Sequence, residues 1–228
     1  GYTFAEKLGH YITSVRPALA SVKIQQSRYF KSCSGNSLSH VNATFVTGKG
    51  VFKATGDLLF THTGLSGPLI LDNSHLFTPN DIIRLKLVPD AGEQLQKIIR
   101  TYPSRTALNA LKALPLSESL LSSILLYLKI DPGTTVRNLA QKQINKLTGY
   151  LNAADFTVKQ VESLATSMST AGGVVLKEVN SATLESRIVP GLYLAGEVLD
   201  YALPTGGFNI QMAFSTGWLA GLSTGKKS

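Results

Sequence analysis

The alternation of hydrophobic and polar positions between residues 20 and 91 predicts short β-strands. Ile83, Leu85 and Leu87 alternate with charged residues, which is the pattern of a strand buried on one face. Other short segments are β-branched or alternate in the same way, namely residues 19–24, 43–46, 51–54 and 58–61. Turns that contain glycine, serine and asparagine separate the segments from one another. Short strands at hairpin-like spacing predict a small barrel or sandwich.

Between residues 92 and 153 the pattern changes to a helical period. The apolar positions that begin at Leu95 and include Ile99 are spaced i, i+3, i+4 and i+7, which is the spacing of one face of a helix. Ser117 begins the stretch Ser-Glu-Ser-Leu-Leu and is expected to cap a helix, and Thr135 is expected to cap the next one. Several short amphipathic helices with brief connections predict a small helical bundle.

The two ends of the chain read differently from the middle. The first residues predict a short helix over 3–11, with Phe4, Leu8 and Tyr11 on its apolar face. The other end predicts three extended segments and a terminal helix, at residues 156–158, 173–179, 189–196 and 209–222. Strand, loop and helix in this succession are typical of α/β structure.

Composition narrows the class of protein. The chain has 228 residues, of which 43% are hydrophobic and 16% charged, so it can bury a substantial core and is not intrinsically disordered. A single cysteine, Cys33, excludes a disulfide-built scaffold and a four-cysteine zinc site. The four histidines have no metal-ligand spacing, so we expect no metal site. No apolar run reaches about 18 residues, so we expect no membrane span and a cytoplasmic protein.

The net charge of +8 raises the question of a nucleic-acid partner. The excess is +3 over residues 21–91 and +4 over residues 92–165, and it is zero over residues 166–228. No basic run exceeds two residues, whereas dedicated nucleic-acid domains usually concentrate their charge. The distribution therefore disfavours nucleic acid, although a basic barrel or helical surface that binds RNA or an acidic protein remains the alternative hypothesis.

The stretch most informative about chemistry begins where an apolar segment ends at Gly196, because glycine lets a ligand approach the backbone closely. Two carboxylates follow at the carboxyl end of this predicted strand, where open α/β sheets bind ligands. A glycine-rich helix start comes next, and its free N–H groups favour an anion or a polarised oxygen. A simpler interpretation is a helix start capped by Asn209. The candidate ligand-binding residues are Gly196, Glu197, Asp200, Thr205, Gly206, Gly207, Phe208 and Asn209.

This stretch resembles the C-terminal flavin-binding motif of two-domain FAD flavoproteins, in which a strand ends Ala-Gly-Asp/Glu. More closely, the chain resembles the bacterial aminoacetone oxidase-like family, also called NAD(FAD)-utilising dehydrogenases. Further blocks carry the resemblance in the same order along the chain: Gly9-His10 with residues 17–19, residues 59–68, and residues 171–174 with Glu178, Thr183, Glu185 and Ser186.

The resemblance implies FAD as cofactor, hydride or electron transfer to a small-molecule substrate, and NAD(P)H as a partner of the parent protein. It places Glu197 at the ribityl or pyrophosphate side of FAD, and residues 206–209 at the pyrimidine edge of the flavin. It names no acid or base, so the catalytic residue is unknown. His62 and Tyr201 are the only candidates for that role that the sequence offers.

The sequence departs from the family in one respect. It lacks the Gly-x-Gly-x-x-Gly segment that binds the ADP part of FAD in the family. We therefore expect a C-terminal fragment of an FAD-dependent oxidoreductase that binds FAD poorly alone and can dimerise through exposed sheet edges. The expected fold is multi-domain α+β, with a barrel and a helical bundle inserted between remnants of a Rossmann-like FAD-binding domain. The expected boundaries are 1–19 and 161–228 for the remnants, 20–91 for the barrel with a return strand at 154–160, and 92–153 for the helices.

Overall fold

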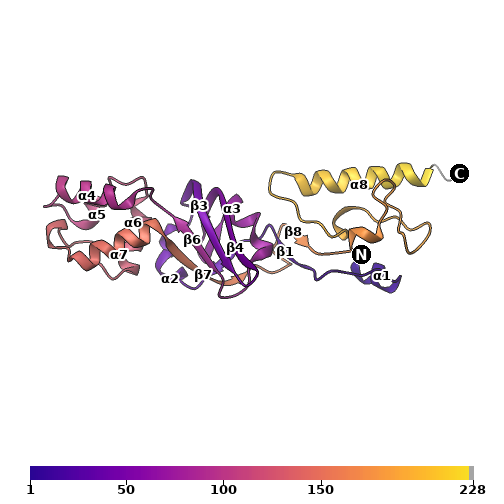
Figure 1. Ribbon diagram of the computed structural model, residues 1–228, viewed down its shortest axis with the longest axis horizontal. Helices are drawn as coiled ribbons and strands as arrows, with labels where there is room; N and C mark the ends of the chain where they lie inside the picture. The colour runs from indigo at the N-terminus through magenta and orange to yellow at the C-terminus, as the bar shows by residue number, and fades with distance from the viewer. Residues whose placement is uncertain (226–228) are drawn as a thin grey trace. The chain divides into compact units, whose positions relative to one another are not determined.

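The computed structural model describes residues 1–225, which fall into two compact units (Figure 1). The barrel unit comprises Ser21–Ile70 and Leu76–Val161. The terminal unit comprises Gly1–Ala20, Leu71–His75 and the segment from Glu162 onward. The chain therefore leaves the terminal unit and returns to it, as an inserted unit requires.

Six antiparallel strands of the barrel unit close into a barrel, which confirms the barrel prediction. The strands are β2 (Val22–Ile24), β3 (Ser37–Thr47), β4 (Gly50–Phe60), β5 (Gly64–Ser66), β6 (Ile82–Lys86) and β7 (Ala154–Val161). Their order around the barrel is β2-β5-β4-β3-β6-β7, so the expected return strand β7 closes it between β6 and β2. Side chains alternate as predicted on β6, where Ile83 and Leu85 are fully buried and Arg84 is exposed.

The turn expected between the predicted segments 51–54 and 58–61 does not form, because both belong to the single strand β4. Gly56 and Asp57 lie inside β4, at a register shift between Leu38 and Val41 of β3. At this irregularity His40 adopts a positive φ of 53°, and its backbone N–H donates to Asp57 Oδ1 at 2.9 Å. The glycine and aspartate therefore accommodate a bulge in a long hairpin instead of separating two strands.

The helices of the barrel unit pack against the barrel (Figure 1). They are α2 (Ser27–Phe30), α4 (Ala91–Thr101), α5 (Ala107–Leu111), α6 (Glu118–Tyr127) and α7 (Gln141–Asn152), with 3₁₀ turns η1 (Lys31–Cys33) and η3 (Val136–Asn138). The Ser117 hydroxyl accepts the Leu120 N–H at 3.3 Å and caps α6, as predicted. Thr135 makes no cap hydrogen bond and precedes only η3, so the predicted helix starts later, as α7. Barrel and helices share one continuous hydrophobic core.

The terminal unit has little regular structure. Its elements are α1 (Tyr2–Lys7), β1 (Arg16–Ala18), β8 (Ser169–Ala171), η4 (Leu176–Glu178), η5 (Gly196–Val198) and α8 (Phe208–Thr224), while α3 (Pro68–Leu71) and η2 (Ser74–Leu76) lie where the chain passes between units. β1 and β8 pair as a two-stranded antiparallel sheet. The terminal helix is confirmed.

Three predictions for the terminal unit are wrong. Residues 173–179 and 189–196 form no strand, but turns and isolated bridges, because their backbone hydrogen bonds go to loops instead of neighbouring strands. The helix predicted over 3–11 ends at Lys7 as α1, Phe4 and Tyr11 are more than 60% exposed, and Ala5 is the buried residue of α1, so the predicted apolar face does not point inward. Within residues 1–225, every helix is too short or too polar to cross a membrane.

Candidate functional site

The candidate site lies in the terminal unit, where η5, the loop over residues 199–207 and the start of α8 follow one another. Gly196 begins η5 with a φ of +74°, a conformation that favours glycine. Its N–H donates to Thr216 Oγ1 at 2.9 Å, and Thr216 is buried on the inner side of α8. This bond ties the Ala-Gly-Glu turn to the middle of the helix.

Glu197 uses one carboxylate oxygen to hold β8. Its Oε1 accepts the Ser169 hydroxyl at 2.6 Å and the Thr170 N–H at 2.7 Å. Its main-chain carbonyl accepts the Tyr2 hydroxyl at 3.0 Å. Among the described residues Oε2 has no hydrogen-bond partner, and the side chain is exposed, so this oxygen is open to a ligand.

A close crossing of two backbone segments, residues 173–174 and 198–200, sets the position of Asp200. The Asp200 N–H donates to the Val174 carbonyl at 2.9 Å, and the Val174 N–H donates to the Val198 carbonyl at 2.8 Å. A Cβ at Gly173 would lie 2.5 Å from the Val198 oxygen, so only glycine fits there. This packing explains Gly173 of the 171–174 block in structural terms, and the preceding Gly172 is required because a Cβ there would collide with the Ser14 carbonyl oxygen. The Asp200 carboxylate is half-buried, and no partner for it lies in the part of the chain that the structure describes.

Tyr201 is the one acid–base candidate that lies beside these residues. Its hydroxyl is buried and has no hydrogen-bond partner within residues 1–225. Burial raises the pKa of Tyr201, and the negative charge of Glu197 and the neighbouring Tyr2 raise it further. The hydroxyl is therefore protonated at neutral pH and can donate to an oxygen. The other candidate, His62, lies in the barrel unit and is exposed.

The start of α8 is glycine-rich and has no side-chain cap. Gly206 and Gly207 have φ values of +108° and +87°, and a Cβ at Gly207 would meet nothing within 4 Å. The first N–H groups of the helix are therefore unpaired by any side chain and carry the positive end of the helix dipole. Phe208 is 54% exposed at this opening. The arrangement favours a partly negative ligand atom.

Two polar clamps hold the loop in front of α8. Asn209 does not cap the helix, so the capping interpretation is wrong: its Oδ1 accepts the Leu203 N–H at 3.1 Å and its Nδ2 donates to the Leu203 carbonyl at 2.8 Å. The Thr205 N–H donates to Asp72 Oδ1 at 2.6 Å. The loop is thus fixed without using the helix N–H groups, which stay available.

A buried network that sequence reasoning did not assign connects the first residues of the chain to its last third. His10 is 3% exposed, with Nδ1 at 3.0 Å from Glu178 Oε2 and Nε2 at 2.9 Å from Ser186 Oγ. The geometry resembles a nucleophile and its base. However, Ser186 Oγ also accepts the N–H groups of Ile188 and Val189, and the hydroxyl is enclosed, so the network is a structural clamp. Its only signal in the sequence was that all three residues belong to the blocks that carry the family resemblance.

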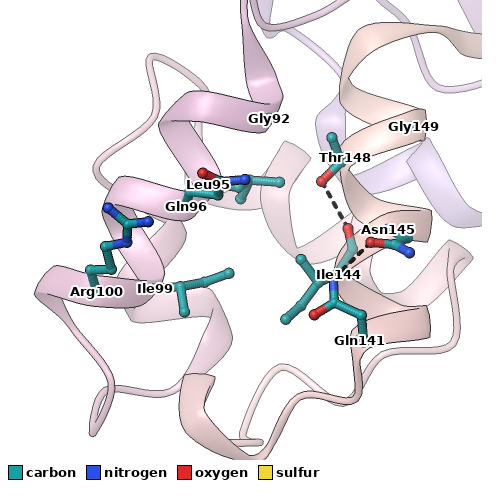
Figure 2. A pocket seen from close by; sticks show the side chains of 10 residues that line it. All are labelled: Gly92, Leu95, Gln96, Ile99, Arg100, Gln141, Ile144, Asn145, Thr148 and Gly149. Atoms are coloured by element: carbon teal, nitrogen blue, oxygen red, sulfur yellow. Dashed lines mark hydrogen bonds between the residues drawn. The ribbon is translucent and has the colours of Figure 1, made fainter.

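The barrel unit carries several concavities, two of which are lined by none of the predicted site residues. One is a groove of about 540 Å³ between α4 and α7, in which Leu95 and Ile99 face Ile144 (Figure 2). The other, of about 650 Å³, lies on the outer face of strands β3, β4 and β6.

Neither a metal site nor a reactive thiol is found among the described residues. Among residues 1–225, no three His, Cys, Asp or Glu side chains gather as a metal site would require. Cys33 is fully buried, and burial raises the pKa of its thiol, which disfavours the reactive thiolate.

Comparison with known proteins places this geometry in context. The chain is 30% identical over 234 residues to a ribosomal RNA dihydrouridine synthase of Haemophilus influenzae, covering 100% of this chain and 56% of that protein. It is 34% identical over 164 residues to the Escherichia coli protein of the same name, covering 71% and 40%. It is 28% identical over 239 residues to the 3-dehydro-bile acid delta(4,6)-reductase of Clostridium scindens, covering 100% and 58%.

The chain thus spans about half the length of these curated relatives. Their names do not support the narrower likeness to aminoacetone oxidases. The resemblance to FAD flavoproteins is confirmed at the level of the family, because the model of the HI0933-like protein Rossmann domain matches residues 1–223. The chain belongs to the HI0933-like Rossmann-domain family.

Proposed function

We propose that this chain forms the flavin-ring side of an FAD-dependent reductase that saturates a carbon–carbon double bond. The observation that carries the proposal is the uncapped, glycine-rich start of α8, which follows Glu197, Asp200 and Tyr201 along the chain. The relatives' names support the reaction class, because dihydrouridine is uridine with one ring double bond reduced and the bile-acid enzyme is named as a reductase. In both cases the name describes the reduction of an unsaturated ring system.

The residues present fit the ring end of a flavin. The open space over Gly207 lets a planar ring approach the backbone, and the unpaired N–H groups after it match the carbonyl oxygens of a pyrimidine edge. The orphaned Tyr201 hydroxyl has no use inside the described residues and supplies a further donor. Glu197 Oε2 can accept a hydrogen bond from a sugar-like hydroxyl.

A bound flavin supplies hydride transfer, and the chain supplies its position and electrostatics. The positive end of the α8 dipole stabilises negative charge next to residues 208–210. Tyr201 holds its proton, so its Oη–H donates instead of repelling an anion. Asn209 and Asp72 keep the loop from collapsing onto the helix start.

The proposal assigns only the ring and ribityl side of FAD to this chain. No Gly-x-Gly-x-x-Gly loop occurs in these 228 residues, so other residues are needed to hold the ADP part. We therefore expect the 228-residue chain alone to bind FAD weakly and to be colourless. NADH or NADPH is the electron source that the family resemblance implies.

The test uses the complete protein that carries this sequence. It is expected to purify with the visible absorption of bound flavin, which bleaches when NADH or NADPH is added without oxygen. Gly207→Asn tolerates a positive φ but places a side chain over the open surface, so it is expected to lower flavin content severalfold. Gly217→Asn, an exposed position in the middle of α8, is the matched control and is expected to keep its flavin. A folded protein without flavin, or equal loss in both variants, contradicts the proposal.

A further inference from the structure

The outer face of the barrel carries a shallow concavity of about 650 Å³ that the flavin proposal does not use. Its polar lining comes from three neighbouring strands, β3, β4 and β6, and consists mainly of Asn42, Thr44, Lys53, Thr55, Arg84 and Lys86. Its apolar lining consists only of two alanines, Ala43 and Ala54. The surface is therefore polar, cationic and without an aromatic anchor.

Strand register brings the three cations together. Thr44 of β3 lies opposite both Lys53 of β4 and Arg84 of β6, and Asn42 lies opposite both Thr55 and Lys86. Directly opposed residues point to the same face of a sheet. Because adjacent strands are about 4.8 Å apart, Lys53 and Arg84 start from backbones about 10 Å apart, on either side of Thr44.

The hydrogen bonds within this face engage Thr55 and Arg84 but leave the Asn42 amide N–H groups and the two lysines without a partner among the described residues. The Thr55 hydroxyl donates to Asn42 Oδ1 at 2.7 Å, which occupies the amide oxygen and leaves the amide N–H groups for a ligand. Arg84 is fixed by Asp155, which accepts from Nε at 2.6 Å and from Nη2 at 2.8 Å. Lys53 and Lys86 are exposed and form no ion pair with any described residue. Three cations thus face one carboxylate.

We infer that this face of the barrel binds the phosphodiester backbone of RNA. Lysine, arginine, asparagine and threonine are side chains that contact phosphate oxygens, and these contacts position a nucleic acid without reading its sequence. The sequence disfavoured nucleic acid because its basic residues are scattered, but the fold gathers Lys53 of β4 with Arg84 and Lys86 of β6 into one patch. An acidic protein fits less well, since protein interfaces depend on buried aromatic or aliphatic anchors and this face offers only alanines.

The inference names a substrate class for the reductase proposed above and rests on that proposal in this respect. Two relatives are named as enzymes of ribosomal RNA. RNA binding itself requires no flavin and no turnover, so it can be measured independently.

The test is a salt titration of RNA binding by the 228-residue chain, measured by fluorescence anisotropy of a labelled single-stranded RNA oligonucleotide. The site variant is Lys53→Gln/Lys86→Gln, and the control is Lys97→Gln/Lys142→Gln, which removes two exposed lysines from α4 and α7 of the same unit. Both pairs change the net charge equally. The site variant is expected to bind about tenfold more weakly, with the slope of log affinity against log salt reduced by about 1.4, while the control changes much less.

Three outcomes would overturn the inference. They are no RNA binding by the unmodified chain at low salt, equal weakening in the site and control variants, and displacement of labelled RNA by polyglutamate as readily as by unlabelled RNA. None of these bears on flavin, because the assay contains none. Conversely, a flavin-free parent protein would refute the reductase proposal and leave the RNA measurement intact.

Discussion

The two units of the molecule achieve stability by different means. The barrel unit buries one continuous core that joins its six strands to the helices packed against them. The terminal unit has a two-stranded sheet and a much smaller core, made of Ala5, Val174, Val179, Leu184, Leu194, Leu199 and Ala220. Charge divides the same way: 16 of the 22 basic and 7 of the 14 acidic residues lie in the barrel unit, which gives +9 there and −1 in the terminal unit.

Polar clamps supplement the small core of the terminal unit. Its segments are joined by His10 and Glu197, each of which makes two hydrogen bonds to segments distant in the sequence, while Asn209 makes two to the loop before α8. Meanwhile α8 leaves large apolar side chains exposed at every fourth position, namely Ile210, Phe214, Trp218 and Leu222. An apolar stripe of this kind is typical of an interaction surface. The barrel unit is thus complete in its own contacts, whereas the terminal unit is not.

The largest expected effect is on the barrel core. Phe156 is fully buried and its ring meets those of Phe30, Phe60 and Tyr150. Phe156→Ala is expected to cost about 3–5 kcal/mol of unfolding free energy, because it removes buried surface and leaves a cavity. Urea unfolding followed by circular dichroism measures this. Phe214→Ala, which removes an exposed ring, is the control. Similar losses of unfolding free energy in both variants would contradict the view that only the barrel unit depends on a large buried core.

The next largest effect is expected at the buried histidine clamp. His10→Ala removes the two buried hydrogen bonds that its ring makes to Glu178 and Ser186, which is expected to cost about 2–3 kcal/mol. The loss should be confined to the terminal unit and appear as faster amide exchange there, with the barrel unit unchanged. His40→Ala is the control, since the His40 side chain is 90% exposed. Equal exchange in both variants would show that the clamp does not hold this unit together.

Sequence periodicity predicted the barrel unit better than the terminal unit, for a physical reason. In the strand around Ile83 and in the helix capped by Ser117, the signal is local, since period, cap and turn lie within a few residues of one another. Residues 173–179 are just as β-branched, but no strand lies beside them to accept their hydrogen bonds. Local propensity cannot report the missing neighbour.

The candidate site shows the same limit. The helix start at Gly207 was predictable because glycines and helix period are adjacent in the sequence. The engagement of Glu197 Oε1 by Ser169, and the pairing of His10 with Glu178 and Ser186, were not, because these partners are 28, 168 and 176 residues apart. The basic face of the barrel was hidden for a similar reason, since only the strand register reveals it.

A smaller effect is expected on self-association through α8. Trp218 is 72% exposed beside Phe214, and burying such side chains in a dimer stabilises it by about 1.5–3 kcal/mol each. Trp218→Glu is therefore expected to weaken association of the 228-residue chain about tenfold or more, measured by analytical ultracentrifugation. Ser215→Glu adds the same charge at an exposed position of the same helix and is the control. If both variants associate as strongly as the unmodified 228-residue chain does, pairing through the edges of the β1–β8 sheet becomes the better explanation of self-association.

The barrel unit should also respond to alkaline pH. Burial raises the pKa of Tyr150, and the nearby Tyr127, Asp155 and Cys33 raise it further, so the folded unit keeps the phenol protonated. The unfolded chain ionises near pH 10, so this contribution to stability is intact below that pH and is lost as the pH rises above it. Tyr150→Phe is expected to reduce this loss. Because the Tyr150 hydroxyl has no partner among the described residues, the variant should also gain about 1 kcal/mol at neutral pH. An unchanged alkaline transition in thermal unfolding would contradict this.

The smallest expected effect tests whether α8 is as open as its exposed side chains indicate. A Cβ at Gly217 would meet nothing within 4 Å, and Gly217 lies in the interior of the helix. Gly217→Ala is expected to stabilise the terminal unit by about 0.5–1 kcal/mol, because alanine loses less backbone entropy in a helix. Gly173→Ala is the opposite case, since its Cβ would lie 2.5 Å from the Val198 oxygen, and it is expected to destabilise the same unit. Amide exchange of the terminal unit measures both. If Gly217→Ala destabilises instead, a closely packed neighbour covers that face of α8 in solution, and the contrast between a complete unit and an incomplete one no longer holds.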